Sequence, residues 1–370
     1  MQKSNKKANS FNCSVEYTYS DKSIRVADEI KFAIIVPVYN TEKYLTECLN
    51  SILSQTYKNF VAFIIDDGFT DSSSRIVDEY SKLDSRIRVI HTKNKGVSSA
   101  RNKALDMIEE DGKFDYILFL DSDDRWVPQC LAIVKTHLMS RVDAVLVFGV
   151  QSFDRKGICS DKVKKMHNPL FFEGNQALDF AFDNYNLKYT VSPAATLFIG
   201  NVVVPYAKTL GLRFDTDLEI GEDQKYKMEA LMRANGLTVI SDLLLQYRLR
   251  RTSLSHSERY YVINERLFIS LSKLVSDKSI GTIRAMERRI ADAWWNGLRY
   301  SAREGTLDDH WKDFSYAYKF MKVRFRTGVL KTFNFKKRII IFTLGKNFTK
   351  IYFKLNGKDV HKVEMSSYFD

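Results

Sequence analysis

The chain has 370 residues, of which 45% are hydrophobic, and a formal net charge of +12. This length can form one large domain with an appendage, or two modest domains, around a sizeable core. The sequence contains no run of eighteen apolar residues, so we predict no membrane-spanning helix. The excess of positive charge leaves three classes of partner open: nucleic acid, an anionic membrane surface and phosphorylated substrates.

Cysteine spacing favours a reducing compartment. The four cysteines, Cys13, Cys48, Cys130 and Cys159, lie far apart and form no paired metal-ligand pattern. We therefore expect free thiols and a cytoplasmic protein. Residues 1–30 are polar without a clear period, and we expect them to form a flexible leader.

Residues 31–125 alternate between apolar runs and helical periods. Phe32–Val38 is a continuous apolar run, typical of a parallel strand that is buried on both faces. Further strands are expected at Val61–Ile65, Ile87–Ile90 and Tyr116–Leu120, and helices at Tyr44–Gln55, Ser72–Lys82 and Val97–Ile108. The alternation predicts right-handed crossovers and an α/β fold, with a mostly parallel sheet flanked by helices.

The pattern becomes less regular after Pro128. We expect a helix from there to about Met139, a strand at Ala144–Val150 and a helix at Glu222–Arg233. Residues 260–303 have a helical pattern, which predicts a helical C-terminal extension.

Acidic residues follow two of the expected strands directly. Asp66 and Asp67 end one strand, and Asp121, Asp123 and Asp124 end another. In open α/β sheets ligands bind at this edge, where the acids would repel each other unless a cation or hydrogen-bond donors offset their charge. A hard divalent cation that bridges a diphosphate would do so. The alternative is that each acid is a turn residue or a helix cap.

Two further segments have groups suited to a nucleotide diphosphate. Gly96 allows close backbone approach at the start of a helix, and Arg101 offers a fork for phosphate. The alternative is an ordinary capped helix with a surface arginine. The basic string that includes Arg250 could close over the diphosphate, and His256 could complete a metal site. The alternative there is a solvated basic loop.

Asp223 is the candidate catalytic base, with Glu222 second. Transfer of a group to a hydroxyl needs a base to take the proton of that hydroxyl, and a carboxylate can serve. The alternative is that both acids simply favour the dipole in the first turn of their helix.

Five segments together resemble the family 2 glycosyltransferases of the glycosyltransferase A fold. They are Ile34–Asn40, Asp66–Asp71, Gly96–Asn102, Leu120–Asp124 and Gly221–Gln224, in this order. The resemblance runs from about Phe32 to Ser255. It implies a catalytic domain at 31–255, with a nucleotide-binding half at 31–125 and an acceptor half at 126–255.

The resemblance also implies roles for individual residues. Pro37, Tyr39 and Asp67 would hold the uracil and ribose of a UDP-sugar. Asp121 and Asp123 would meet ribose and Mn²⁺ or Mg²⁺, Asp124 would lie near the donor sugar, and Asp223 would be the base of an inverting single displacement. With the segments above, the cofactor-binding set is Pro37, Tyr39, Asn40, Asp67, Gly96, Arg101, Asp121, Asp124 and Arg250; the metal set is Asp121, Asp123 and His256.

Two positions depart from the family pattern. Phe69 replaces the usual serine after Asp-Asp-Gly, and Arg250 stands where many relatives carry a histidine. Arginine does not bind a metal cation, so His256, or the diphosphate and waters, would have to fill the coordination sphere. These departures keep open the alternative of a nucleotide-sugar-binding protein that has lost turnover.

The segment Lys331–Lys354 has seven Lys or Arg and no acid, interleaved with aromatic residues and isoleucines. We expect a helical extension at 256–330 and a basic tail at 331–370. The segment lies in this tail, and its composition suits peripheral contact with the anionic inner face of the cell membrane. Packing onto the main domain and a nucleic-acid patch are alternatives, but no nucleic-acid module is recognised elsewhere. A basic membrane-associated adaptor is therefore a rival to the favoured function, an inverting hexosyltransferase that builds a bacterial surface glycan on a glycan or lipid-linked acceptor.

Overall fold

The computed structural model describes residues 30–250, except 69, 155–156, 159–167, 183–198 and 219–220, and short groups or single residues between 270 and 350. The leader expected at 1–30 lies outside the described residues apart from Ile30. Four other predicted features also lie outside the described residues: His256, Phe69, most of the expected extension at 256–330, and all of the tail at 331–370 except Lys350. Within the described residues, no helix is long and apolar enough to cross a bilayer.

The first half of the sheet is parallel, as expected. Strands β1 (Phe32–Val38), β2 (Phe60–Asp66), β3 (Ile87–His91) and β4 (Tyr116–Phe119) lie in the order β3-β2-β1-β4, and each pair is parallel. Every residue of β1, β2 and β4 is buried, which explains their continuous apolar runs. The strand order reverses between β1 and β4, and such a switch point is where open α/β sheets bind ligands.

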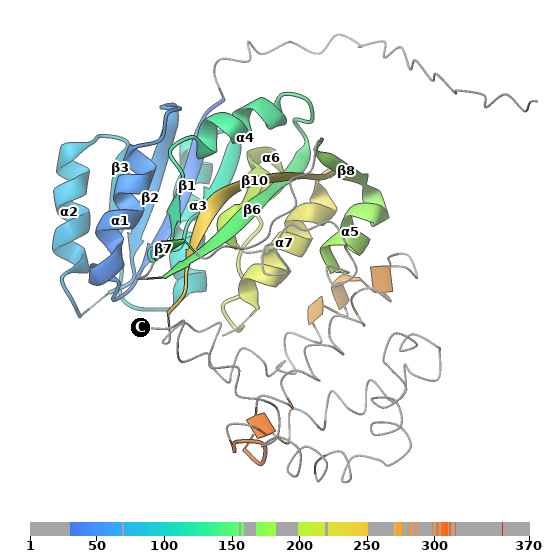
Figure 1. Ribbon diagram of the computed structural model, residues 1–370. Coiled ribbons are helices and arrows are strands. Elements are labelled where there is room, and N and C mark those ends of the chain that lie inside the picture. Colours follow the sequence, from blue (N-terminus) through green and yellow to red (C-terminus); the bar gives the residue numbers. More distant parts are fainter. Residues whose placement is uncertain are drawn as a thin grey trace, which may run out of the picture.

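Three helices connect these strands. They are α1 (Glu42–Leu53), α2 (Ser73–Leu83) and α3 (Val97–Asp111), within three residues of the expected bounds at each end. Helix α1 packs against α2, whereas α3 packs against β1 and β2 (Figure 1). The connections therefore place the starts of α2 and α3 beside the carboxyl ends of the strands that precede them.

The second half of the sheet is mixed. It continues from β4 through β9 (Val202–Pro205), β6 (Ala144–Asp154) and β10 (Gly236–Arg248) to β5 (Arg125–Trp126). Strand β9 is antiparallel to both neighbours, whereas β6 and β10 are parallel to each other. The remaining elements are β7 (Gly157–Ile158), β8 (Leu170–Glu173), α4 (Cys130–Leu138), α5 (Gly174–Phe182), α6 (Tyr206–Thr209), α7 (Glu222–Arg233) and a 3₁₀ turn (Ile199–Asn201).

The pairing of β10 with β6 shifts register in mid-strand. Gly236–Val239 pair with Ala144–Val147, but after two irregularities Leu245 pairs with Val150. Strand β10 thus has three more residues than β6 over the same span. Its last residues then run alongside the turn that follows β4, because β5, in that same turn, pairs with Leu245 and Gln246.

An aromatic cluster fixes α7 beneath the end of β4. The rings of Phe214 and Tyr226 stack with centroids 4.0 Å apart, and Phe119 at the end of β4 meets both edge-on at 5.5 Å. Such aromatic contacts add to the burial of large apolar surfaces. The cluster therefore holds the first turn of α7 close to the residues that follow β4.

The hydroxyl of Tyr226 generates a stability prediction. It is fully buried and has no hydrogen-bond partner among the described residues. We expect Tyr226→Phe to raise the free energy of unfolding by about 1 kcal/mol, because it removes an unsatisfied buried donor. Tyr226→Ala should lower it by about 3–5 kcal/mol, because it leaves a cavity. Urea denaturation followed by circular dichroism measures both, and a destabilised Tyr226→Phe would contradict this account of the hydroxyl.

Candidate functional site

The loop after β2 is built around the carboxylate of Asp67. This buried carboxylate accepts the backbone N–H of Lys95 at 2.9 Å and that of Gly96 at 2.8 Å. It therefore holds the loop that leads into α3. Gly68 has a φ of +69°, and a Cβ there would lie 2.7 Å from the backbone nitrogen of Asn94. Only glycine fits this close approach, which explains the Asp-Asp-Gly sequence.

Asp66 points to a different set of partners. Its carboxylate accepts the backbone N–H of Gly68 at 2.9 Å and lies 2.5 Å from Nδ1 of His91, whose Nε2 lies 3.1 Å from Asp78. The bond to Asp66 raises the pKa of His91. Of the two adjacent acids, Asp66 thus ties β2 to β3 and α2, a role that the sequence analysis did not assign to either residue.

The end of β1 contributes an exposed surface beside this loop. Pro37 is buried within the strand, whereas Tyr39 is 48% exposed and Asn40 is also exposed. Asn40 has a φ of 50°, and its Oδ1 accepts the backbone N–H of Thr70 at 2.8 Å. The loops after β1 and β2 are thereby joined, and the ring of Tyr39 is left accessible to a ligand.

Arg101 of α3 is the central contact of the site. Its side chain is buried, with one terminal nitrogen 2.9 Å from Oδ1 of Asp121 and the other 3.0 Å from Oε1 of Glu222. The guanidinium also lies over the ring of Phe214 at 5.2 Å. The alternative of a surface arginine is therefore wrong. Arg101 joins α3, the turn after β4 and the start of α7, and its contact with phosphate stays a prediction.

The turn after β4 is held by the end of β10. Oδ1 of Asp124 accepts the backbone N–H of Arg248 at 2.8 Å, and the carbonyl oxygen of Asp123 accepts the Nε–H of Arg248 at 2.8 Å. Burial raises the pKa of Asp124 well above its ordinary value, and the charges of Asp123 and Asp121 raise it further. Cationic partners thus offset part of the repulsion among these acids.

The candidate base has its own buried cation. Asp223, in the first turn of α7, lies 2.6 Å from Nζ of Lys227, one helical turn later, and the Lys227 side chain is only 3% exposed. Burial alone would raise the pKa of Asp223, but the Lys227 ammonium and the Arg101 guanidinium outweigh it and hold that pKa below its ordinary value. Asp223 is therefore kept ionised, as a base must be.

Glu222 behaves in the opposite way. Burial raises its pKa, and the neighbouring charge of Asp223 raises it further, although Arg101 opposes both effects. Because Glu222 is bonded to Arg101, it fixes the start of α7 and leaves Asp223 as the better placed base.

The predicted metal set can be tested against these contacts. One oxygen of Asp121 is bonded to Arg101, and Oδ2 of Asp123 lies 2.5 Å from a terminal nitrogen of Arg250. Within the described residues, no group of three His, Cys, Asp or Glu side chains could hold a metal ion. The side chains of this part of the chain thus do not fit a cation site of their own. The predicted third ligand, His256, lies outside it.

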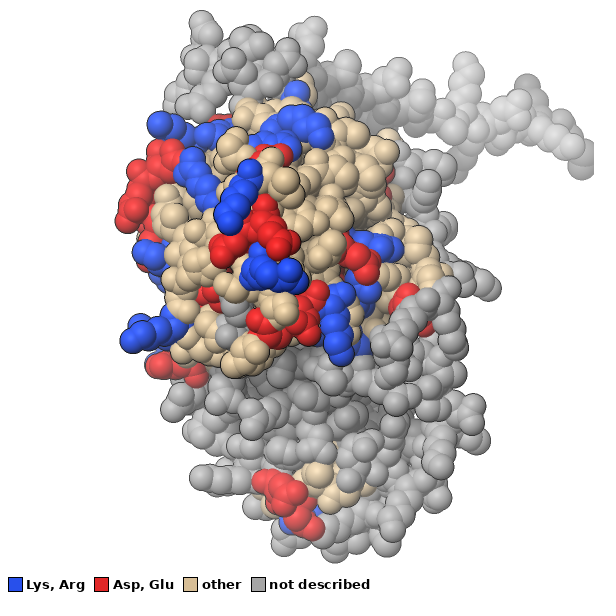
Figure 2. Space-filling view, turned by 90° about the vertical axis from the view of Figure 1, so that its left-hand side faces the viewer, with Lys and Arg blue, Asp and Glu red and all other residues tan. Residues whose placement is uncertain are grey.

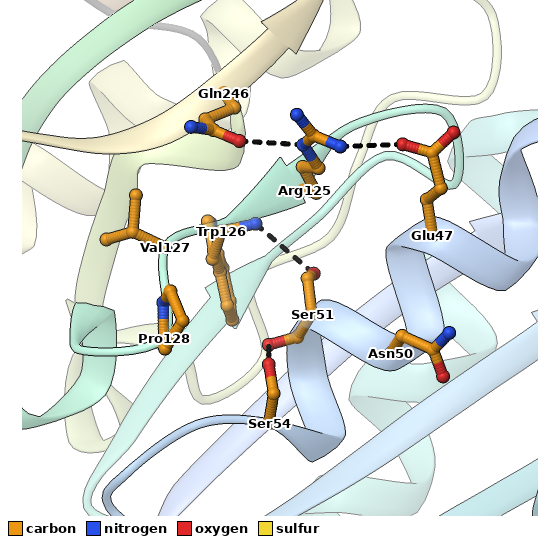
Figure 3. Close-up of a pocket in the computed structure, with 9 residues that line it drawn as sticks. All are labelled: Glu47, Asn50, Ser51, Ser54, Arg125, Trp126, Val127, Pro128 and Gln246. Carbon is orange, nitrogen blue, oxygen red and sulfur yellow. Dashed lines mark hydrogen bonds and ion pairs between the residues drawn. The ribbon is translucent and has the colours of Figure 1, made fainter.

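A separate pocket of about 380 Å³ lies beside β5 (Figure 3). Helix α1, the residues around β5 and the end of β10 line it, and Arg125 crosses it between Glu47 at 2.8 Å and Gln246 at 2.7 Å. None of the predicted site residues lines this pocket. It is therefore distinct from the place where Arg101 joins Asp121 to the start of α7.

Surface charge does not favour a nucleic-acid partner on the face shown in Figure 2. There, Lys and Arg side chains alternate with Asp and Glu side chains over the described part of the molecule. A phosphate backbone would require a more uniform basic surface.

Known proteins resemble this chain in sequence and in fold. The family model described as Glycosyl transferase family 2 matches residues 33–196. Residues 33–196 are thus similar to the family 2 glycosyltransferases. The glycosyltransferase A fold expected from the sequence is confirmed by a crystal structure of residues 1–349 of Staphylococcus aureus TarS in complex with UDP. It matches with a TM-score of 0.57 and 19% identity, over 92% of this chain and 93% of that one.

Two relatives illustrate how far the similarity extends. The glycosyltransferase GlyA of Streptococcus pneumoniae is 30% identical over 232 residues, which cover 61% of this chain and 31% of GlyA. The poly(ribitol-phosphate) beta-N-acetylglucosaminyltransferase TarS of S. aureus is 29% identical over 243 residues, or 64% of this chain and 38% of TarS. The chain thus spans about a third of the length of either relative.

Several contacts of the candidate site could not be found, or were not sought, in the sequence. Lys227 could have been found, because it lies four residues after Asp223 on an expected helix. His91 and Arg248 carried no such signal, since their partners Asp66 and Asp123 are distant in the chain.

The buried position of Arg101 predicts a large contribution to the free energy of unfolding. We expect Arg101→Met to lower the free energy of unfolding by about 3–5 kcal/mol, because Asp121 and Glu222 would lose their shared cation in a buried site. Arg75→Met is the matched control: its pair with Glu79 is exposed, and its loss should cost less than about 1 kcal/mol. Urea denaturation of both variants measures the difference. Equal effects would show that the Arg101 bridge contributes no more than a surface pair.

Proposed function

We propose that this chain transfers a hexose from a UDP-sugar to a hydroxyl group of a bacterial surface glycan. The observation that carries the proposal is the Arg101 bridge. It connects Asp121, at the ligand-binding edge of the sheet, to the helix turn that holds the ionised Asp223. The edge that we propose for nucleotide binding and the proposed base would thereby belong to one site, which suits group transfer from a nucleotide.

The donor class is supported by the relatives. TarS is named as an N-acetylglucosaminyltransferase, and two crystal structures of TarS are complexes with UDP and with UDP-GlcNAc. In this chain, the exposed ring of Tyr39 and the loop shaped by Asp67 would receive the uridine. Lipo-oligosaccharide, capsule and O-antigen chains are the glycans that we propose as products.

The chemistry proposed is a single displacement. Asp223 takes the proton of the acceptor hydroxyl as its oxygen forms a bond to the anomeric carbon of the donor. The bond from that carbon to the diphosphate oxygen breaks on the opposite side, and UDP leaves with the electron pair. The sugar centre is thereby inverted. Dependence on Mn²⁺ or Mg²⁺ stays a prediction, and no step above uses a metal.

The acceptor side is proposed from the sequence alone. The basic segment at 331–354 would bring the chain to the inner face of the cell membrane, where a lipid-linked acceptor would lie. A nucleotide-sugar-binding protein without turnover remains the rival function, motivated by Phe69 and Arg250.

The role of Asp223 predicts a separation of binding from turnover. We expect the chain to release UDP from at least one member of a UDP-sugar panel, measured with and without Mn²⁺. Asp223→Asn should lower that rate by about 10²–10⁴-fold, because the base is lost, while calorimetry shows unchanged UDP binding. Asp217→Asn, on an exposed residue nearby, is the control. Near-normal turnover in Asp223→Asn would overturn the base assignment, and no UDP release from any donor would favour the rival.

The ammonium of Lys227 predicts a pH effect. Lys227→Met removes the cation that lowers the pKa of Asp223, so that pKa should rise. A base is active only when deprotonated, so the acid limb of the kcat/KM profile should move to higher pH. The value of kcat/KM on the plateau should fall less than its value at acid pH. The pH profiles of both proteins measure this. An unchanged acid limb would mean that Asp223 is not the titrating base.

A further inference from the structure

Arg250 holds one of the two carboxylates that the sequence assigns to a metal. A terminal nitrogen of Arg250 lies 2.5 Å from Oδ2 of Asp123, and the two side chains are 22% and 15% exposed. Arg250 is the second residue after β10, and it is the residue that departs from the histidine of the family pattern. A permanent cation thus occupies the carboxylate that a divalent ion would need.

The neighbouring arginine is engaged by other partners. Arg248 donates to Glu47 at 2.9 Å and to the carbonyl oxygen of Asp123, and its backbone N–H bonds to Asp124. Its guanidinium lies 4.8 Å from the ring centre of Tyr44. Arg248 therefore secures the turn after β4 and is poorly placed to turn toward a ligand.

Arg250 is less committed. Its guanidinium lies 5.3 Å from the same Tyr44 ring, which orients it, and its buried Nε–H has no hydrogen-bond partner among the described residues. A guanidinium has five donors in a planar fork that matches phosphate oxygens. Arg250 can therefore keep its contact with Asp123 and still offer donors to an anion at the ligand-binding edge of the sheet.

The charge balance of this edge favours an internal cation. Asp121 is paired with Arg101, and Asp123 is paired with Arg250. A divalent ion would have to share or displace these guanidinium groups. A diphosphate, in contrast, would bring its own negative charge to a guanidinium that is already in place.

We propose that Arg250 serves as the resident cation of the site. It neutralises Asp123 in the free protein and binds the diphosphate of the nucleotide donor, so that the chain binds a nucleoside diphosphate without a divalent ion. This inference rests on the proposed function, because it assumes that UDP binds at the edge marked by Asp67 and Asp121.

The decisive measurement is calorimetric titration of UDP into the full chain, in Mn²⁺ and in EDTA. For the wild-type chain, we expect the two dissociation constants to differ by less than about threefold. Arg250→His should bind UDP about tenfold or more weakly in EDTA, because a charged hydrogen bond is lost, and should regain affinity in Mn²⁺. Arg250→Met should bind weakly in both buffers. Arg75→Met, which removes an arginine from the exposed surface of α2, should match the wild-type chain.

A second measurement uses the metal alone. Free Mn²⁺ is counted by electron paramagnetic resonance as the ion is titrated into protein without nucleotide. Arg250→His should bind Mn²⁺ about tenfold more tightly than the wild-type chain, because Asp123 is released and an imidazole is added. Circular dichroism confirms that each variant is folded before it is compared.

The outcomes separate this inference from the proposed function. If wild-type UDP binding is strong in Mn²⁺ and vanishes in EDTA, the inference is overturned and the proposed function stands. The inference is also overturned if UDP binding by Arg250→His depends on Mn²⁺ no more than UDP binding by the wild-type chain does. If the wild-type chain binds UDP in neither buffer, both proposals fail.

Discussion

The site depends on one buried guanidinium. Removing Arg101 from water is costly, and the structure compensates with two carboxylates that lie far apart in the sequence, Asp121 and Glu222. Because the compensation requires both, the turn after β4 and the start of α7 can adopt only positions that satisfy the same cation. The cluster of Phe119, Phe214 and Tyr226 supplies the apolar side of this arrangement. Electrostatics and packing therefore specify the same geometry.

The aspartates of the candidate site differ in the contacts that they make, and therefore in their roles. Asp66 and Asp67 are consumed in holding loops, the first through His91 and the second through two backbone N–H groups. Asp124 anchors the end of β10, whereas Asp223 remains ionised and partly exposed. Aspartates of one sequence motif thus have several structural roles. Only the contacts of each carboxylate show which aspartates are available for chemistry.

The sequence was most informative where both faces of the sheet are covered. Phe32–Val38 matches β1 at both ends, because a strand buried on two faces is apolar throughout. Glu222–Arg233 matches α7 as well. The antiparallel β9 was not anticipated, since its four residues are too few to show a period. Nor could the partnership of Arg101 with Glu222 be found, because 121 positions separate them and pattern analysis contains no information about such pairs.

The shifted register of β10 has a consequence for how this fold can vary. Side chains alternate between the faces of a strand, so an odd surplus of three residues over β6 exchanges the faces of everything downstream. Arg248 lies at the end of β10, downstream of this surplus. A single residue gained or lost between Val239 and Leu245, with the bulge unchanged, would move the pairing of Arg248 by one position and turn its side chain to the opposite face. Insertions and deletions in this stretch should therefore survive only in pairs.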